Sequence, residues 1–456
     1  MNAIPKGIKQ YLPSSIELEQ IIENNPPDFS YKLDFLVHLL HLTIEIPAKN
    51  KGLLSHDGYV PFNAQILQKR DRNYHKHIDY LLKVGILEYD GKGYQPGKKS
   101  RRYRISEKYL CSTLKTVLIT DKVLVRQLNS ENDVDIQAMQ SYDYLYKWFD
   151  KRINIDIQAA EDYLLNELTS SMNHGYYQAY ASMYSKIWKL RALKDLRFWF
   201  KVDLKGRRLH TNFTNLNKEL KQFITFDGKP LVSIDVKNSQ PYLSVKLLEK
   251  IYSNQSISVL NTPTHYNMLV ENKGSQGFTD VSHYIELVKE GIFYEFLVTN
   301  LRKHFGEGYL LPTWRYIFDK KRIEWDTASP RDLAKRIFYE IAFSKTSSKK
   351  SKEKSLFRML FPNVLHVFEL IKAKKHSELA CSLQRIEASL ILDKVCSEIA
   401  LYHPEIPLFN IHDSIVTTKG NEAIVKSAIL NHFEKEIGFP PKIQQEEWSF
   451  NVKIAA

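Results

Sequence analysis

The first 110 residues place apolar and polar positions in a pattern that predicts helices followed by a hairpin. Apolar stretches at residues 35–42 and 59–67 precede a third at 78–86, whose apolar positions have helical spacing and stop at Gly85. An apolar strand, a glycine-containing turn and a basic strand follow over residues 86–105. The sequence therefore predicts three helices and then a two-stranded hairpin.

Positive charge gathers on this hairpin. Residues 69–104 hold eleven Lys or Arg and four Asp or Glu, a net charge of +7 out of +13 for the whole chain. Three helices followed by a basic hairpin is the order of a winged helix, in which one helix enters the major groove and the wing touches phosphate. The residues expected to contact nucleic acid there are Lys98, Lys99, Arg101 and Arg102. The alternative is a small structural domain whose charges form a solvated face.

Two later segments have informative patterns. Residues 134–200 read as long helices, in which Tyr176, Tyr180, Tyr184 and Trp188 recur every four residues. These rings are expected to pack a core, with stacking on bases as the alternative. Residues 345–354, KTSSKKSKEK, are too polar to bury and have the composition of a loop.

Composition narrows the class of protein. With 456 residues, 43% of them hydrophobic, the chain can bury a core large enough for two or three domains. A charge of +13 favours a polyanionic partner, and nucleic acid is the first candidate. Only three cysteines occur, too widely spaced for a zinc site and too few for a disulfide framework, so we expect a reducing, cytoplasmic compartment. The start of the chain lacks the apolar core of a signal peptide and no long apolar window occurs, which disfavours secretion and membrane spanning.

Two apolar strands each end in a single aspartate. These are LVSIDV, with Asp235, and PLFNIHD, with Asp413. Mg²⁺ is a hard cation that is usually held by one or two carboxylates together with substrate phosphates. Two such carboxylates side by side could hold two Mg²⁺ ions, or Mn²⁺ as a substitute, about 3.5–4 Å apart for phosphoryl transfer. Taken singly, either aspartate is equally consistent with a strand-end cap or a turn residue.

The segment SPRDLAKRIFYEIAFS, between the two aspartates, predicts a helix with an ordered stripe of side chains. Ser329 and Pro330 are typical of an N-cap and a first helical position. The positions that follow at steps of four are Arg331, Lys335, Tyr339 and Phe343. Cations followed by rings suit the phosphates and the base of a nucleoside triphosphate. The alternative is an amphipathic helix with exposed charges and buried rings.

Taken together, these three segments resemble motifs A, B and C of the family A polymerase superfamily, which includes DNA polymerase I and the single-subunit phage and mitochondrial RNA polymerases. The strand with Asp235 is similar to motif A, the helix from Arg331 to Phe343 to motif B, and the HDS sequence at residues 412–414 to motif C. Four further segments resemble the family in the same order: residues 206–216, 283–297, 361–371 and 382–392. The resemblance covers residues 205–418.

The resemblance implies a role for each matching residue. Asp235 and Asp413 would be metal ligands, and Arg331 and Lys335 would contact the triphosphate. Tyr339 would lie near the nascent base pair, Phe343 at the templating position, and His412 beside the primer end. Arg208 and Gln384 would contact the duplex, and Gln240 or Tyr242 would face the 2′ position of the sugar.

The chain also departs from the family pattern. The run DVKNSQPY after Asp235 has no acidic residue and is closer to the form in family B polymerases. Phe343 and Ser344 stand where the family has a Tyr-Gly pair.

We therefore expect an α+β fold with a right-hand polymerase palm and helical fingers. The predicted domains are a winged-helix-like module at residues 1–125, a helical thumb-like region at 126–204, and a palm with a fingers insertion at 205–456. The expected function is a small DNA polymerase without proofreading, acting on primer–template DNA in the replication of a phage or mobile element, within a bacterial or phage-infected cell. The alternatives are an RNA polymerase or primase on the same palm, favoured by the HDS form of motif C, and a non-catalytic DNA-binding replication initiator.

Overall fold

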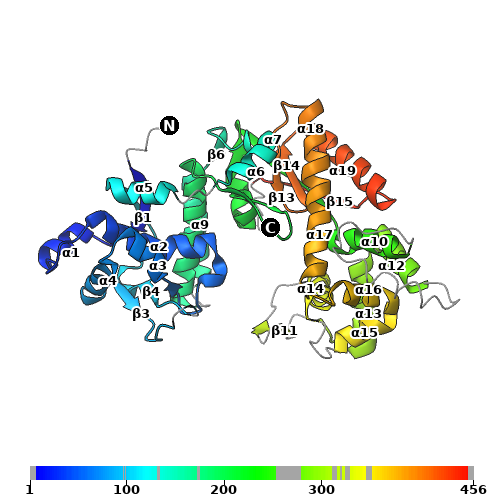
Figure 1. Cartoon of the computed structure of the whole chain (residues 1–456), viewed down its shortest axis with the longest axis horizontal. Coiled ribbons are helices and arrows are strands. Elements are labelled where there is room, and N and C mark those ends of the chain that lie inside the picture. The colour runs from blue at the N-terminus through cyan, green and yellow to red at the C-terminus, as the bar shows by residue number, and fades with distance from the viewer. Residues whose placement is uncertain are drawn as a thin grey trace, which may run out of the picture.

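A computed structural model of the chain describes residues 7–95, 97, 99–130, 134–171, 175–252, 279–310, 316–318, 321–323, 329–345 and 352–449. Its fold is mixed α+β, with helices around antiparallel sheets. In Figure 1 the chain forms an arch, with the N-terminal module on the left, the largest sheet at the top of the middle, and a group of helices from α10 to α16 at the lower right. None of the described helices combines the length and the apolar character needed to cross a bilayer.

The N-terminal module contains the helices and the hairpin that the sequence predicts. Its elements are β1 (Ile8–Pro13), α1 (Leu18–Asn24), α2 (Leu33–Lys49), η1 (Lys51–Leu53), β2 (Val60–Pro61), α3 (Ala64–Arg70), α4 (Tyr74–Lys83), β3 (Leu87–Tyr89), β4 (Arg102–Ile105), η2 (Glu107–Tyr109), β5 (Leu114–Ile119) and α5 (Lys122–Ser130). The Asn63 side chain accepts hydrogen bonds from the first backbone amides of α3, and Gly85, at φ +69°, ends the turn after α4. A three-stranded sheet in the order β2-β4-β3 packs with these helices.

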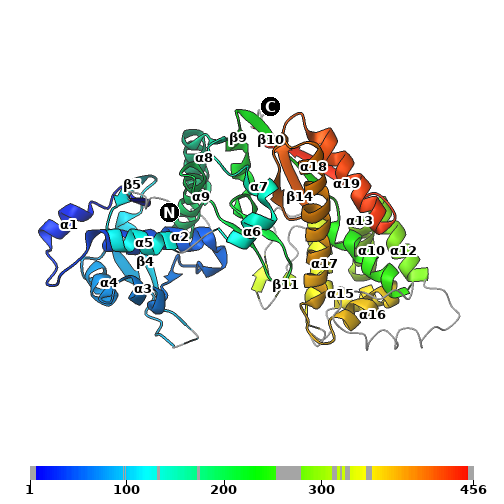
Figure 2. The same ribbon diagram turned by 45° about the horizontal axis from the view of Figure 1, so that its top comes forward.

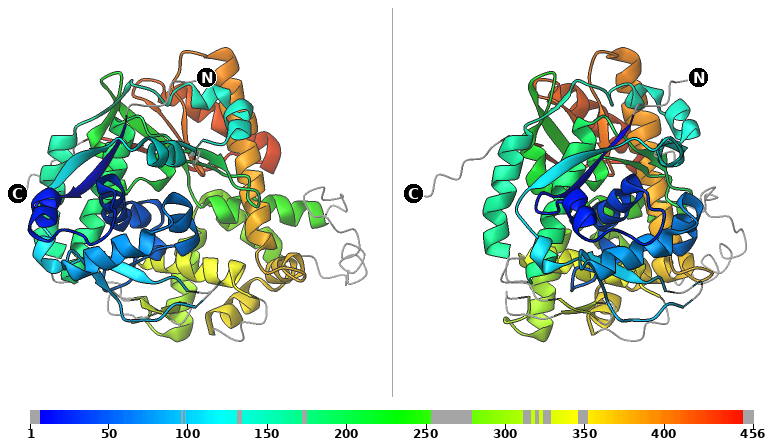
Figure 3. Two further views of the ribbon diagram at one scale, coloured as in Figure 1. Left: turned by 60° about the vertical axis from the view of Figure 1, so that its left-hand side comes forward. Right: turned by 90° about the vertical axis from the view of Figure 1, so that its left-hand side faces the viewer.

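This module has a hydrophobic core of its own. The core runs from Leu12 through α2, α4 and the small sheet, and it includes Leu124 and Val125 of α5, with Leu128 packed against it. Residue 125, the predicted boundary, lies inside α5, and the apolar face of that helix belongs to the core of the module. Figure 3 turns the module toward the viewer and shows its helices and small sheet in front of the rest of the chain.

The module is joined to the rest of the chain through α9 (Tyr176–Lys194), which packs along α2. Trp188 donates from Nε1 to Nε2 of His41 at 3.2 Å, and the Tyr184 hydroxyl donates to the carbonyl of Cys111 at 2.6 Å. Tyr180, Tyr184 and Trp188 are all buried. The interpretation of this aromatic stripe as core packing is confirmed.

The main sheet has the strand order β13-β14-β10-β9-β6, with β15 also paired to β10. Its strands are β6 (Ile153–Ile155), β9 (Ile224–Phe226), β10 (Lys229–Val236), β13 (Phe409–Ile411), β14 (Ser414–Thr418) and β15 (Ile443–Glu447). A separate ribbon pairs β7 (Phe200–Val202) with β8 (Leu209–Thr211). The main sheet includes β6, and the β7-β8 ribbon spans residue 204, so both features cross the predicted division between residues 126–204 and 205–456.

Helices cover this sheet and form the lower right of the arch. They are α6 (Ile136–Ser141), α7 (Asp143–Tyr146), α8 (Ile157–Ser171), η4 (Phe213–Asn215), η5 (Lys218–Phe223), α10 (Ser239–Tyr252), α12 (Thr279–Glu290), α13 (Phe293–Phe305), α14 (Pro330–Phe343), α15 (Lys352–Leu360), α16 (Pro362–Ile371), α17 (Glu378–Ala388), the π-helical η7 (Ser389–Cys396), α18 (Ser397–Tyr402) and α19 (Glu422–Ile437). A small hairpin pairs β11 (Tyr316–Phe318) with β12 (Lys321–Ile323). In Figure 2 the segment from α17 to α18 is one continuous rod beside the sheet, and α19 packs against β10 and β14.

The polar segment at residues 345–354 is not wholly a loop. Residues 346–351 lie outside the described residues, but α15 begins at Lys352, and Glu353 and Lys354 are buried. Lys354 pairs with Glu369 at 2.9 Å, and Glu353 accepts a hydrogen bond from the Tyr309 hydroxyl. The prediction that this segment is too polar to bury is wrong for these two residues, because each has a partner for its charge.

His41 is a buried titratable group at the junction of the module and α9. Its ring is 1% exposed, with Nδ1 at 3.2 Å from the Tyr11 carbonyl and Nε2 accepting from Trp188. Burial lowers the pKa of His41 to about 4, and the charge of Arg197 adds to this effect while Glu45 opposes it. The imidazole is therefore neutral in the folded protein at neutral pH.

We predict that acid weakens the fold through His41. A histidine that must stay neutral in the folded state binds protons more readily when unfolded, so its contribution is complete above pH 6.5 and is lost as the pH falls toward 4. At pH 5 the loss is about 2 kcal/mol of unfolding free energy. Denaturant unfolding at pH 7 and pH 5 measures it, with His41→Gln as the comparison. An equal pH dependence in the variant and the natural chain would contradict the assignment.

Candidate active site

The pairing of β10 with β14 brings the two predicted aspartates together. In the register of these antiparallel strands Asp235 lies opposite Ser414, the residue that follows Asp413. The backbone amide of Val236 donates to the carbonyl oxygen of Asp413 at 3.4 Å. Two residues far apart in the sequence thus meet at one end of the sheet.

The two carboxylates repel each other. Burial and the charge of Asp413 raise the pKa of Asp235 to about 7, while the cations of Lys335 and Lys221 oppose the rise. A divalent cation with oxygen ligands would relieve this repulsion, so the pair fits Mg²⁺ or Mn²⁺. Within the described residues, no group of three or more His, Cys, Asp or Glu side chains is arranged to hold a metal. Such a site therefore offers these two carboxylates and leaves other positions for substrate oxygens.

The helix α14 starts as the sequence predicts. Ser329 and Asp332 form a reciprocal capping box, with Pro330 in the first turn. Arg331 donates to Glu295 at 2.8 Å and to the side-chain oxygen of Asn238 at 2.5 Å. Because Asn238 lies just after β10, Arg331 links the helix to the strand that carries the first aspartate.

The rest of the stripe on α14 faces the same end of the sheet. The ammonium of Lys335 lies 5.7 Å from the centre of the Tyr339 ring, and the Tyr339 and Phe343 rings are 5.6 Å apart. Burial, with a further contribution from Asp413, raises the pKa of Tyr339 to about 12. Lys335 acts electrostatically on Asp235, and Asp413 acts on Tyr339, so these two residues of the stripe lie near the carboxylate pair.

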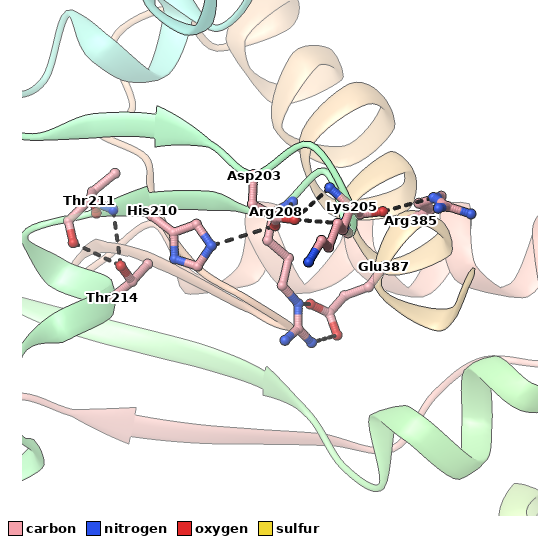
Figure 4. Close-up of polar contacts among 9 residues, drawn as sticks. Asp203, Lys205, Arg208, His210, Thr211, Thr214, Arg385 and Glu387 are labelled. Atoms are coloured by element: carbon pink, nitrogen blue, oxygen red, sulfur yellow. Dashed lines mark hydrogen bonds and ion pairs between the residues drawn. The ribbon is translucent and has the colours of Figure 1, made fainter. Parts of the chain in front are cut away.

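Arg208, Glu387 and Gln240 form a buried polar group beside the aspartates. Arg208 donates from Nε and Nη2 to the two oxygens of Glu387 at 2.8 and 2.7 Å (Figure 4), and Gln240 donates to the same carboxylate at 3.1 Å. The Glu387 side chain is 2% exposed, and burial raises its pKa to about 7 against the opposing charge of Arg208. Asp413 adds to the rise, so Glu387 is a third carboxylate close to the pair.

The turn that carries Arg208 is held by Asp203. One carboxylate accepts backbone hydrogen bonds from Lys205, Gly206 and Arg208 at 2.9, 2.6 and 3.0 Å. Gly206 is required at this turn, because a Cβ there would lie 2.3 Å from the side-chain oxygen of Gln384. Gln384 therefore packs against the turn, next to the arginine with which the sequence associates it.

Glu387 is the residue that sequence reasoning missed. It lies three positions after Gln384 in a helix whose neighbouring positions are mostly apolar. A carboxylate on the buried face of such a helix is the only signal in the sequence, and it does not indicate the partner.

Tyr242 does not lie at this site. Its ring is 2% exposed and stacks on Phe433, and its hydroxyl donates to the carbonyl of Phe439 at 2.6 Å. The structure places Tyr242 in the core against α19, so its proposed contact with a sugar is withdrawn. Of the two residues considered for that contact, Gln240 is the one beside Glu387.

His412 lies in the turn between β13 and β14. Its backbone is in the left-handed region at φ +56°, and its ring lies 5.8 Å from that of His210. Burial, with the charge of Arg208, lowers the pKa of His412 to about 4. Nδ1 is buried without a hydrogen-bond partner among the described residues. A neutral ring with an unused nitrogen thus lies next to Asp413.

The predicted nucleic-acid contacts of the hairpin lie far from this site in the fold, on the N-terminal module. Lys98 is outside the described residues. Lys99 and Arg101 are exposed and Arg102 is partly exposed. Arg101 lies 5.9 Å from the centre of the Tyr89 ring.

Comparison with known proteins gives a distant structural likeness. Neither protein-family profiles nor curated protein sequences match the chain. Among solved structures the chain is similar to the POL domain of Pol1 from M. smegmatis in complex with DNA primer-template and dNTP, with 11% identity and a TM-score of 0.28. The likeness covers 64% of this chain and 56% of that one. At this level of likeness, the function has to be argued from the residues of the chain itself.

We predict that the ion pair between Arg208 and Glu387 stabilises the fold by giving a buried carboxylate its partner. Arg208→Ala should lower the free energy of unfolding by about 3 kcal/mol, because a buried carboxylate loses its partner. The double variant Arg208→Ala/Glu387→Gln should recover part of that loss, since no charge remains buried. The neighbouring Arg207, which is 56% exposed, provides the control as Arg207→Ala. Urea unfolding of the four proteins tests the pair, and a double variant less stable than Arg208→Ala would contradict it.

Proposed function

We propose that the chain is a template-directed nucleotidyltransferase and, more specifically, a small DNA polymerase without proofreading. The observation that supports this best is the meeting of three separately predicted segments. The strand of Asp235, the turn of Asp413 and the helix of Lys335 converge on one electrostatically coupled group. Phosphoryl transfer requires such a group, with carboxylates for metal ions and cations for the phosphates.

Each side chain then has a defined task. Asp235 and Asp413 would hold Mg²⁺ or Mn²⁺, which when bound neutralises the charge on the transferring phosphoryl group. Lys335 and Arg331 orient the triphosphate, and Tyr339 and Phe343 offer rings to the nascent base pair. His412, whose Nδ1 has no hydrogen-bond partner in the described part of the chain, would lie beside the primer end.

The group of Arg208, Glu387 and Gln240 lies on the sugar side of this arrangement. A guanidinium that donates to both oxygens of one carboxylate is held in one orientation. A fixed orientation suits contact with the end of a duplex. Gln240 donates to the same carboxylate. Of the two residues expected to face the 2′ position of the sugar, it is the one that lies at this site. An amide discriminates a 2′-hydroxyl less strictly than a ring does, so we expect a modest preference for dNTPs over NTPs.

One prediction of this proposal concerns the two aspartates. Asp235→Asn and Asp413→Asn should each lower nucleotide incorporation by about a thousandfold or more, because the metal-dependent charge stabilisation is lost. Binding to primed DNA should persist in both. The control is Asp227→Asn, an exposed aspartate in the turn before the same strand. Primer extension and calorimetric titration with Mn²⁺ measure incorporation and metal binding.

The same assay separates the competing functions. Primed DNA and RNA templates are offered with dNTPs and NTPs separately. Efficient use of NTPs in preference to dNTPs would favour the RNA polymerase or primase, and normal incorporation by either aspartate variant would exclude this site as the catalytic one. Binding without any incorporation by the natural chain would favour the non-catalytic replication initiator.

Another prediction of this proposal concerns the contact between Lys335 and the triphosphate. Lys335→Ala should lower kcat/KM for the nucleotide by about tenfold or more, because a charge-assisted contact to phosphate is lost. Lys303→Ala removes an exposed cation from the neighbouring helix α13 and should leave kcat/KM unchanged. Steady-state primer extension over a range of nucleotide concentrations measures both. Equal kinetics in the two variants would mean that Lys335 is only a solvated charge.

A further inference from the structure

A pocket of about 350 Å³ opens on the N-terminal module between α3, α4 and the β3-β4 hairpin. Its floor consists of buried apolar or aromatic side chains, namely Phe62, Leu67, Ile78 and Tyr103. The Phe62 and Tyr103 rings are in contact, with their centres 5.0 Å apart. The floor is therefore apolar and part of the core of the module.

Aromatic side chains also form the walls. Tyr94, from the hairpin, is 49% exposed, so much of its ring is open to solvent at the edge of the pocket. Tyr74 and His75 line the pocket from the start of α4, with ring centres 5.9 Å apart. Gln65, Gln68 and Asp79 add hydrogen-bonding groups to the lining.

A cation borders the pocket. Arg101 lines it and contacts the hydroxyl of Tyr103. An apolar floor, exposed rings, amide groups and this guanidinium together match a nucleobase attached to a phosphate backbone. A paired base inside a duplex is stacked on both faces and cannot enter such a pocket, whereas an unpaired base can.

The opposite side of the hairpin is less suited to such a contact. Arg104 lies 3.4 Å from the centre of the Tyr177 ring on α9 and 4.3 Å from that of Tyr59, and it is paired with Glu88 at 2.8 Å. A second hollow on that side is lined by this paired arginine and by the carboxylates of Asp57 and Asp90. The pocket beside Tyr94 is the one that combines a buried apolar floor with exposed rings.

We propose that this pocket binds one unpaired nucleobase of a nucleic-acid strand, so that the N-terminal module recognises a junction between duplex and single strand. Tyr94 stacks on the base, and Arg101 contacts a flanking phosphate. The proposal goes beyond nucleotide transfer and does not depend on it.

Fluorescence anisotropy with the full chain, in EDTA and without nucleotides, tests the proposal. The probes are a blunt DNA hairpin, the same hairpin with one unpaired nucleotide at its 3′ or its 5′ end, and versions in which the unpaired nucleotide is abasic. The natural chain should bind at least one overhang about tenfold more tightly than its abasic counterpart, the size expected for one stacked base. Tyr94→Ala should reduce this ratio to less than about twofold while leaving the blunt hairpin unaffected.

Two further variants make the result specific. Tyr31→Ala removes a tyrosine of the same module that is 41% exposed and outside the pocket, and it should keep the natural ratio. His75→Ala, on the opposite wall, should lower the ratio as Tyr94→Ala does. Equal binding of normal and abasic overhangs by the natural chain would overturn the proposal, as would an equal loss of affinity for blunt and overhanging probes in Tyr94→Ala. Since the assay contains no metal or nucleotide, either outcome leaves the proposed polymerase activity standing.

Discussion

The antiparallel pairing of β10 with β14 is the constraint on which the rest of the candidate site depends. This register sets Asp235 opposite Ser414 and so holds two carboxylates at one end of the sheet. Their repulsion, together with burial, costs free energy that the sheet itself has to provide, through the buried strands on both sides. The repulsion therefore lowers the stability of the folded protein, and a bound cation would relieve it. Carboxylates with such shifted pKa values are typical of functional sites.

The neighbouring elements respond to this concentration of negative charge. Lys335 from α14 and Lys221 from η5 direct positive charge toward Asp235. Glu387 brings a third carboxylate, but Arg208 and Gln240 satisfy it, so that it serves as an anchor. A buried ion pair contributes little net stability, yet it restricts the positions of its members. The group thereby fixes Arg208 and Gln240 relative to the aspartates.

The N-terminal module is attached by contacts of a different kind. His41 with Trp188, and Arg104 with Tyr177, join polar groups to aromatic rings across the junction with α9. The first contact lies on α2 and the second on β4 of the hairpin. Together with the packing of α2 along α9, they hold the module against the rest of the chain.

Features that depend on nearby residues were accessible from the sequence. The cap at Ser329, the stop at Gly85 and the strand that ends in Asp235 each follow from the side chains within a few positions, because hydrogen bonding and steric limits there are local. The order of helices and hairpin in the N-terminal module, and the burial of the aromatic stripe on α9, follow from periodicity in the same way.

Other features were decided by the tertiary structure alone. Arg208 and Glu387 are 179 residues apart, and no local pattern indicates their pairing. The spacing of Tyr242 after Asp235 was compatible with the site, but the rotation of α10 turns its ring toward Phe433 and away from the carboxylates. The polar sequence around Lys354 predicts an exposed side chain, but Lys354 is buried and paired with Glu369. The sequence predicts a helical region where β6 lies, but β6 pairs with β9 in the main sheet. In each case the outcome depends on which faces of distant elements pack together, and that is settled by burial over the whole chain.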